Sequence, residues 1–129
     1  MADPPPPRFA VLEHSWNGVH WDFLLQRDGA LRTWALDGIP SLGVERLARP
    51  LADHRLLYLD YEGPIPGGRG SVRRVDGGEY EELEWGEARI RVRLRGRQLV
   101  GEALLTRRPR DEADDPEEPY WKISLGKFD

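Results

Sequence analysis

One ten-residue stretch, ARIRVRLRGR (residues 88–97), constrains the fold more strongly than any other part of this sequence. Arginine occupies every odd position from 89 to 97, and the even positions between them are Ala88, Ile90, Val92, Leu94 and a glycine. Alternation with a period of two separates two residue types onto the two faces of a β-strand, whereas a helix would scatter both types around its axis. The stretch therefore predicts a strand with one apolar face and one basic face.

The basic face of this strand has two interpretations. A row of guanidinium groups is suited to contact the phosphate backbone of a nucleic acid. The alternative places a hairpin turn at Gly86-Glu87, so that Glu84 lies opposite Arg89. In the same register Glu82 lies opposite Arg91, and the row forms ordinary cross-strand ion pairs.

The rest of the chain is built from pieces of similar length, separated by turn residues. Asp28-Gly29 is a typical two-residue hairpin turn, and no segment of ten or more residues has a helical period. The expected strands are residues 9–13, 19–26, 31–36, 52–63, 72–75, 78–85, 88–96, 98–106 and 120–125, with a short helix allowed within 37–50. We therefore predict a mostly β fold, a small closed or nearly closed β-barrel with at most one short helix.

The chain length and composition narrow the organisation. At 129 residues we expect one domain over residues 9–129, preceded by a flexible, Pro-rich segment at 1–8 and containing an acidic loop at 111–118. There is no cysteine, which excludes disulfide scaffolds and thiol nucleophiles, so any metal site must use His, Asp or Glu. We expect no membrane association and a cytoplasmic protein, because no long apolar run and no secretion signal are visible.

Two of the three histidines lie within EHSWNGVHWDF, residues 13–23. His20 and Asp22 are two apart on an expected strand, so their side chains share a face. His14 ends the preceding strand, and a turn at Asn17-Gly18 brings it alongside. Two imidazoles and one carboxylate match the ligands of a catalytic divalent metal that keeps coordination positions open. The alternative is a pair of ordinary surface histidines.

The third histidine, His54, precedes Tyr58 by four residues within the expected strand 52–63. On a continuous strand these two side chains share a face, so an imidazole and a phenol would converge on one oxyanion. Taken alone, His54 is better interpreted as a surface histidine on a strand.

These motifs together resemble a known family. The segments FAVLEHSWNGVHWDFLL, LRTWAL, RLARPLADHRLLYLDYEGPIP, LRGRQLVGEALLTRR and YWKI are similar, in this order, to the 3′-phosphoesterase domain of the bacterial DNA ligase D family. The similarity runs from Phe9 to Ile123, and its specific elements are H-x5-H-x-D and D-H-x3-Y. The resemblance implies a compact β-barrel that binds manganese and trims the 3′ end of a primer strand, removing a terminal ribonucleoside and then the remaining 3′-phosphate.

The resemblance also implies roles for individual residues. The metal, Mn²⁺ in the family, would be held by His14, His20 and Asp22, although this ligand set also suits other divalent ions such as Zn²⁺ or Fe²⁺. His54 and Tyr58 would contact the phosphate, and Arg46 matches an arginine of the family. The implied partners are nucleic acid 3′ ends in a primer–template and separate ligase or polymerase proteins of end joining. We expect the chain itself to be a monomer.

The sequence departs from the family where a phosphate would be clamped. Leu24 stands where the family motif has an arginine, and Leu12 stands where it has a glutamine. Since Leu24 follows Asp22 by two residues, we expect its side chain at the site and expect Leu24→Arg to raise 3′-phosphatase activity by at least about tenfold. Candidate substitutes for the missing cation are Arg32, Arg69 and Lys122.

Two functions remain open at this point. The first is a metal-dependent phosphoesterase that trims nucleic acid 3′ ends in DNA end repair. The alternative is a catalytically impaired module of the same fold that binds nucleic acid ends or phosphate, because the loss of one charge-assisted clamp is enough to silence a slow enzyme.

Overall fold

The computed structural model describes residues 3–108 and 120–127. The expected acidic loop at 111–118 lies outside these residues. The elements are β1 (Arg8–Ser15), β2 (Val19–Arg27), β3 (Ala30–Leu36), β4 (Arg46–His54), the 3-10 helix η1 (Leu56–Leu59), β5 (Gly63–Pro64), β6 (Ser71–Trp85), β7 (Arg89–Gly96), β8 (Val100–Arg107) and β9 (Trp121–Gly126).

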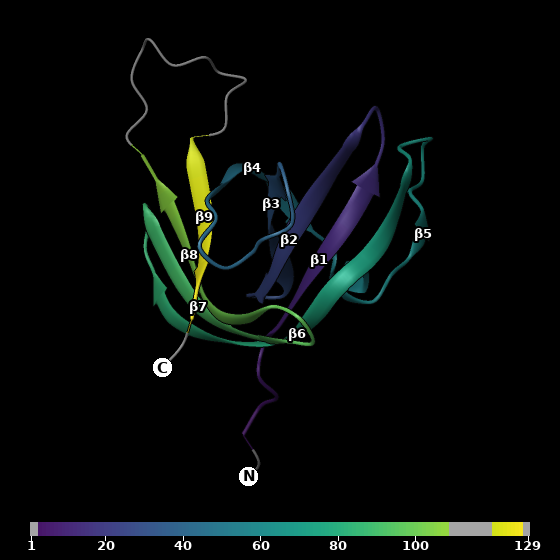
Figure 1. Ribbon diagram of the computed structural model, residues 1–129. Coiled ribbons are helices and arrows are strands. Elements are labelled where there is room, and N and C mark those ends of the chain that lie inside the picture. The colour runs from purple at the N-terminus through teal and green to yellow at the C-terminus, as the bar shows by residue number, and fades with distance from the viewer. Residues whose placement is uncertain (1–2, 109–119, 128–129) are drawn as a thin grey trace.

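The strands form one antiparallel sheet that closes on itself (Figure 1). The order is β1-β2-β3-β4-β9-β8-β7-β6, and β6 pairs with β1 to complete an eight-stranded barrel, while the short β5 adds to β6 as an extra strand. Closure leaves no unpaired edge in the barrel itself. The prediction of a mostly β, closed barrel with at most one short helix is confirmed, since η1 is the one helix among the described residues.

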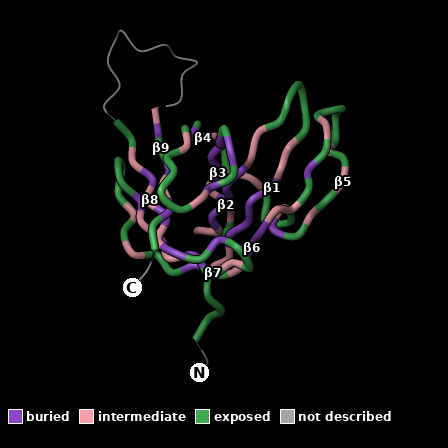
Figure 2. Tube along the Cα trace, viewed as in Figure 1, coloured by how far each residue is buried: buried purple, intermediate pink, exposed green. Residues whose placement is uncertain are grey.

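The barrel has a core inside and a second, smaller core outside. The inner core is formed by large side chains that alternate along the strands, among them Phe9, Phe23, Trp34, Leu94 and Ile123. The outer core lies on the other face of β1–β3 and beneath η1, and its members are Ala10, Leu12, Leu24, Leu31, Leu59 and Val72. Figure 2 shows buried positions along β1–β3 and exposed positions along most connecting loops. Both faces of these three strands are therefore covered in the region around Ala10, Leu24 and Leu31.

Several predicted boundaries need correction. The expected strand at 52–63 is wrong, because β4 starts at Arg46 and ends at His54, and the chain then turns into η1. This turn buries Leu59 to 4% exposure in the outer core, which a continuing strand would not do. The short helix allowed within 37–50 is absent there, and the one short helix lies at 56–59 instead.

The predicted break between residues 72–75 and 78–85 does not exist, because β6 is one strand of 15 residues. Gly77 and Gly78 lie where β6 exchanges β1 for β7 as its partner. A Cβ on Gly78 would lie 2.2 Å from the carbonyl oxygen of Arg95, so only glycine fits this close approach. The glycines thus mark a corner of the barrel.

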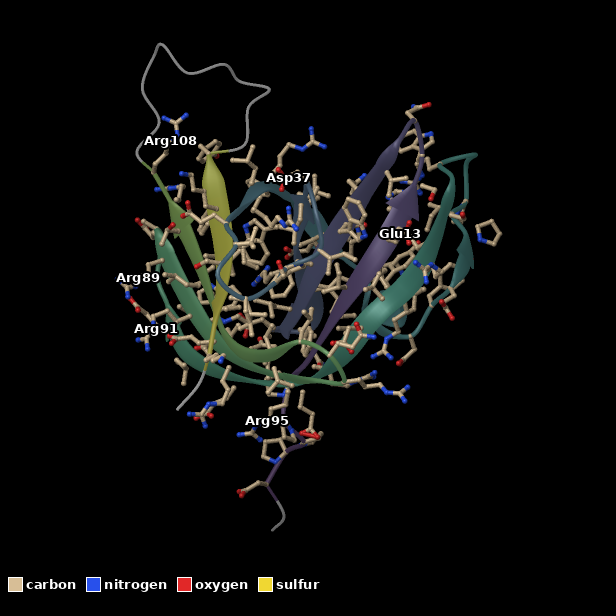
Figure 3. All side chains as sticks on the ribbon, in the orientation of Figure 1. Glu13, Asp37, Arg89, Arg91, Arg95 and Arg108 are labelled. Atoms are coloured by element: carbon tan, nitrogen blue, oxygen red, sulfur yellow. The ribbon has the colours of Figure 1, made fainter. Side chains whose placement is uncertain are left out.

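The arginine face of β7 is paired with acidic side chains on both neighbouring strands. The ion pairs are Arg89–Glu84 at 3.3 Å, Arg91–Glu102 at 2.5 Å, Arg93–Glu81 at 3.7 Å and Arg95–Glu81 at 3.6 Å. Figure 3 shows Arg89 and Arg91 on the outside of the barrel, far from Glu13 on β1. The ion-pair interpretation is therefore supported. Its predicted register is wrong, because Glu84 lies opposite Arg91 and a bulge separates Glu82 from Glu84.

Asp76 on β6 anchors the turn between β7 and β8. Its carboxylate accepts hydrogen bonds from the backbone N–H groups of Arg97 at 3.0 Å, Gln98 at 3.0 Å and Leu99 at 2.7 Å, and the residue is 4% exposed. Burial alone would raise the pKa of Asp76, but the backbone donors of Leu99, Gln98, Gly77 and Arg97 outweigh it and hold the pKa below its usual value. One buried carboxylate thus ties β6 to the far end of β7.

None of the helical structure in the described part of the chain has the length and apolar character of a membrane-spanning segment.

Asp76→Asn is expected to lower the free energy of unfolding at pH 7 by about 1–3 kcal/mol, because the amide group offers an N–H₂ where backbone donors need acceptors. The folded pKa lies below the unfolded value of about 3.9, so the contribution is complete above the unfolded pKa and is lost as pH falls through the folded pKa. Urea unfolding of both proteins should therefore show a smaller difference near about pH 2.5 than at pH 7. Glu87→Gln, in an exposed turn, is the control. Equal stability of Asp76→Asn and wild type would contradict this role.

A candidate metal centre on the outer face of the barrel

The first hairpin brings His14, His20 and Asp22 together. In the β1–β2 register His14 lies opposite His20, and Leu12 lies opposite Asp22. All three side chains are on the outer face, because Trp21 and Phe23, which flank Asp22, pack in or against the inner core. His14 Nδ1 lies 3.2 Å from His20 Nε2 and 3.7 Å from Asp22 Oδ2, and His20 Nε2 lies 3.0 Å from Asp22 Oδ1. The predicted turn at Asn17 has the left-handed φ of 53° that such a short connection needs.

The loop before β6 fixes the orientation of the His14 ring. His14 Nε2 lies 2.8 Å from the carbonyl oxygen of Arg69, so Nε2 is the donor and Nδ1 keeps a lone pair toward the cluster. This contact requires the loop to lie against the end of β1. At Gly70, with φ +78°, an added Cβ would lie 1.9 Å from the Ser15 carbonyl oxygen. The glycine-rich loop therefore approaches β1 itself, and the Arg69 backbone carbonyl orients a candidate histidine ligand.

The cluster has the donor chemistry of a cation site. Asp22 is 2% exposed, and its Oδ1 has no hydrogen-bond donor among the described residues, since His20 Nε2 is close to it without hydrogen-bond geometry. The three candidate ligand atoms lie within 4.8 Å of one another. Atoms bound about 2.1 Å from one ion are roughly 3.0–3.6 Å apart for angles between 90° and about 120°. The two histidine nitrogens are 3.2 Å apart, and His20 Nε2 lies 3.0 Å from Asp22 Oδ1, both within that range, while His14 Nδ1 lies 3.7 Å from the other oxygen, Oδ2, just outside it.

His54 and Tyr58 meet although they do not share a strand. β4 ends at His54, and one turn of η1 carries Tyr58 back over it, so that the two rings are 5.9 Å apart at 67°. The expected convergence is therefore present, but a 3-10 turn produces it. His54 Nδ1 donates to the carbonyl oxygen of Ala52 at 2.9 Å, which leaves Nε2 as the ring nitrogen available to a ligand. Tyr58 packs on its other side against the outer core.

One cleft of about 510 Å³ contains both groups of residues. It is lined by the three cluster residues together with His54 and Tyr58, and also by Trp16, Arg49, Asp53, Arg55 and Arg69. Five of the predicted site residues and the candidate Arg69 thus share a single cavity. The Arg69 side chain donates from Nε to the carbonyl oxygen of Pro66 at 2.9 Å.

The other candidate cations do not line this cleft. Arg32 faces the opposite side of β3 from the cluster and pairs with Asp53 and, at 3.5 Å, with Asp28. Arg46 donates from Nε to the carbonyl oxygen of Ile39 at 3.1 Å and holds the 37–39 loop. Lys122 lies on β9, 4.0 Å from Glu45. Their prediction as phosphate-binding groups or substitutes finds no support in this arrangement.

The Leu24 side chain lies on the predicted outer face of the sheet but is not at the candidate site. It follows Asp22 on the outer face of β2, yet it is 0% exposed and belongs to the outer core under Leu59. The expectation that its side chain borders the phosphate is therefore wrong, because η1 covers this part of the face. Alternation predicted the direction of the side chain, and only the tertiary fold shows what lies over it.

Sequence reasoning missed three residues of the cleft. Trp16 is 46% exposed at the tip of the first hairpin, with its ring stacked at 24° on His14. Arg49 on β4 and Arg55 at the start of η1 are exposed cations in the same cavity. The position of Trp16 beside a candidate ligand was a usable signal. Arg49 could not be found without knowing how β3 and β4 pair.

A family model and several known proteins similar to this chain all point to the same family. The DNA Ligase D 3′-phosphoesterase domain family matches residues 12–107, a range that includes the cluster, His54 and Tyr58. The chain is 40% identical over 82 residues to the multifunctional non-homologous end joining protein LigD of Pseudomonas aeruginosa, which is 60% of this chain and 10% of that protein. It is 33% identical over 108 residues to LigD of Mycobacterium bovis, 77% of this chain and 14% of that protein. The chain therefore spans only a small part of these relatives.

We expect Leu24→Arg to destabilise the protein by about 3 kcal/mol or more, since it forces a guanidinium into an apolar cluster or displaces Leu59 and the helix that carries Tyr58. Chemical unfolding measures the loss. Leu24→Met, which keeps the volume, is the matched control and should cost less than about 1.5 kcal/mol. A fully stable Leu24→Arg protein would show that the outer core opens readily at this position.

Proposed function

Because this chain belongs to the DNA ligase D 3′-phosphoesterase family, we propose that it is a metal-dependent phosphoesterase acting on the 3′ ends of nucleic acid in end-joining DNA repair. The observation that carries this proposal is the cluster of His14, His20 and Asp22, whose ligand atoms lie within 4.8 Å of one another in the same cleft as His54 and Tyr58. The relatives are named as multifunctional end joining proteins. Separate ligase or polymerase proteins of end joining are accordingly proposed partners.

The proposed metal is Mn²⁺, held by His14 Nδ1, His20 Nε2 and an oxygen of Asp22. A bound divalent ion supplies positive charge to a nonbridging phosphate oxygen and makes a coordinated water easier to deprotonate. The choice of manganese follows the family, since two imidazoles and a carboxylate also suit Zn²⁺ and Fe²⁺. The protein contributes fixed orientation, through the Arg69 carbonyl behind His14 and the burial of Asp22.

His54 and Tyr58 have the chemistry to act on the phosphate itself. With Nδ1 committed to the Ala52 carbonyl, His54 Nε2 is the atom that would deliver a proton to the leaving oxygen. The Tyr58 hydroxyl would donate a hydrogen bond to a phosphate oxygen. Trp16, exposed beside His14, offers a flat apolar surface on which a terminal base can stack. Together these groups suit a strand end, where a phosphate and a base are presented side by side.

A binding module remains the second candidate, and the observation that favours it is Leu24. A buried apolar side chain stands at the position of the family arginine, so the site lacks that charge. Such a protein would hold a 3′ end without turning it over.

The metal proposal predicts that wild type binds about one Mn²⁺ per chain and that Asp22→Asn and His20→Ala each lose it, because three protein ligands leave little affinity when one is removed. Calorimetric titration or elemental analysis after reconstitution measures the stoichiometry. Asp53→Asn is the matched control, since Asp53 lines the same cleft but pairs with Arg32 outside the cluster. Wild type without stoichiometric metal after reconstitution would refute the site.

The catalytic proposal predicts Mn²⁺-dependent release of inorganic phosphate from a 3′-phosphorylated primer–template, and of the terminal nucleoside from a primer ending in a ribonucleotide. His54→Ala should lower kcat by about 10²- to 10⁴-fold, the usual value of a general acid. Its melting temperature should stay close to wild type, because the ring is only partly buried and its one described hydrogen bond is to a local carbonyl. Unfolding of His54→Ala at ordinary temperature would assign it a structural role instead. Metal binding without any release of phosphate would support the binding module.

A further inference from the structure

We propose that Arg49, on β4, is the cation that holds the substrate's phosphate beside the metal cluster and that it does so from two strands away. This inference rests on the proposed function of the cleft as a phosphoester site. It assigns a binding role to a residue that the sequence motifs do not include. It also makes a phosphate with several free oxygens, such as a terminal monoester, the preferred ligand.

The strand register places Arg49 in line with the cluster. Asp22 lies opposite Ala35 on β3, and Ala35 lies opposite Arg49 on β4. The neighbours of these residues that belong to the inner core are Phe23, Trp34 and Ala48. Because strand faces alternate, Asp22, Ala35 and Arg49 all lie on the outer face. The irregularity in the β3–β4 pairing falls between Leu31 and Thr33 and does not disturb this row.

Ala35, which lies between Asp22 and Arg49, is small enough for the Arg49 guanidinium to reach the cluster. Two strand spacings separate the backbones of Asp22 and Arg49, about 10 Å in total. Ala35 rises only one carbon above the sheet, so the long arginine side chain can extend over it. Arg49 and Asp22 accordingly line the same cleft, whose floor includes the apolar Leu12 and Leu51. A phosphate that sits over Ala35 would have the cluster on one side and a guanidinium on the other.

Arg49 is also free to bind a ligand. Arg32, Arg46 and Arg69 each donate to a protein oxygen. Among the described residues Arg49 is exposed and makes no ion pair or side-chain hydrogen bond in the structure. Arginine presents several N–H donors in a plane and binds two oxygens of one phosphate at once. A cation kept unpaired beside a cluster of metal-ligating atoms is the arrangement that an anionic ligand completes.

Arg55 is the rival within the same cleft. It too is exposed and without a side-chain partner in the described part of the chain. However, it precedes η1, beyond the end of β4, and it therefore lies on the His54 side of the cavity and outside the row that contains Asp22. The register favours Arg49 as the group that shares a phosphate with the cluster.

Calorimetric titration of the Mn²⁺-loaded full chain with inorganic phosphate tests the proposal, because this probe cannot be turned over. Arg49→Ala should weaken phosphate binding at least tenfold, and Arg49→Lys should recover only part of the affinity, since a lysine binds as a point charge. The affinity for Mn²⁺ alone should not fall in either variant. Arg55→Ala should change phosphate affinity less than threefold, and Arg107→Gln, an exposed arginine on β8, should leave it unchanged.

Phosphate affinity within twofold of wild type in Arg49→Ala would overturn the proposal, as would wild type that does not bind phosphate or a larger loss in Arg55→Ala than in Arg49→Ala. Arg49→Gln, which keeps most of the side chain, replaces Arg49→Ala if the latter has a lowered melting temperature. The two proposals fail separately. Arg49-dependent phosphate binding in a protein that releases no phosphate from a primer would refute the catalytic function alone, whereas primer trimming that is indifferent to Arg49 would refute this inference alone.

Discussion

The outer face of β1–β3 is the feature on which the rest of the site depends, because it has to serve as an apolar surface and a polar site at once. The inner faces of these strands fill the barrel, and their outer faces support a second core under η1. Strands covered on both sides have near-continuous apolar sequences, which explains the runs FAVL in β1 and FLL in β2. The second core ends at Leu12 and Leu24, and the cluster begins in the next positions along the same two strands, at His14 and Asp22. Asp22 is therefore nearly buried at the boundary of the two regions, where an unpaired carboxylate oxygen is costly unless a positive ligand joins it.

The fold could be predicted largely because its signals are local. Strict alternation in residues 88–97, the Asp28-Gly29 turn and the absence of a helical period each follow from a few adjacent residues. The errors concern segments whose conformation depends on distant contacts. Residues 52–63 have an extended pattern in isolation, yet Leu59 is buried on strands that are far away in the sequence, and the chain turns at His54 to allow it. Gly77 and Gly78 resemble a turn signal but serve a strand corner, which exists only because the sheet closes into a barrel.

The same division applies to the site. His14, His20 and Asp22 are grouped by one hairpin, so alternation and a turn signal were sufficient to place them side by side. His54 and Tyr58 were grouped correctly through an incorrect conformation, since one turn of 3-10 helix brings residues four apart as close as a strand would. The choice among arginines could not be made in this way. Arg32 is next to a position on the outer face of β3, but because successive side chains alternate its own side chain points to the opposite face. Arg69 contributes its backbone oxygen to His14, a contact that no side-chain pattern encodes.

Leu24 stands where the resemblance to the family implies an arginine, and its surroundings show what a leucine contributes at this position. A charged group at position 24 has to pass from beneath η1 to reach the cleft, whereas leucine there adds to the outer core and holds η1 and Tyr58 in place. A cation on β4 avoids this conflict, because Arg49 lies beyond the covered region and next to a small residue, Ala35. Leucine at position 24 thus contributes packing, and the proposed phosphate-binding cation lies where the sheet is open to solvent. A phosphate at the proposed site would need a guanidinium within reach of the candidate metal ligands, and in a closed sheet several strands offer a position on the same face. A cation on β4 can therefore serve the proposed site without any change in the position of the cluster or of His54.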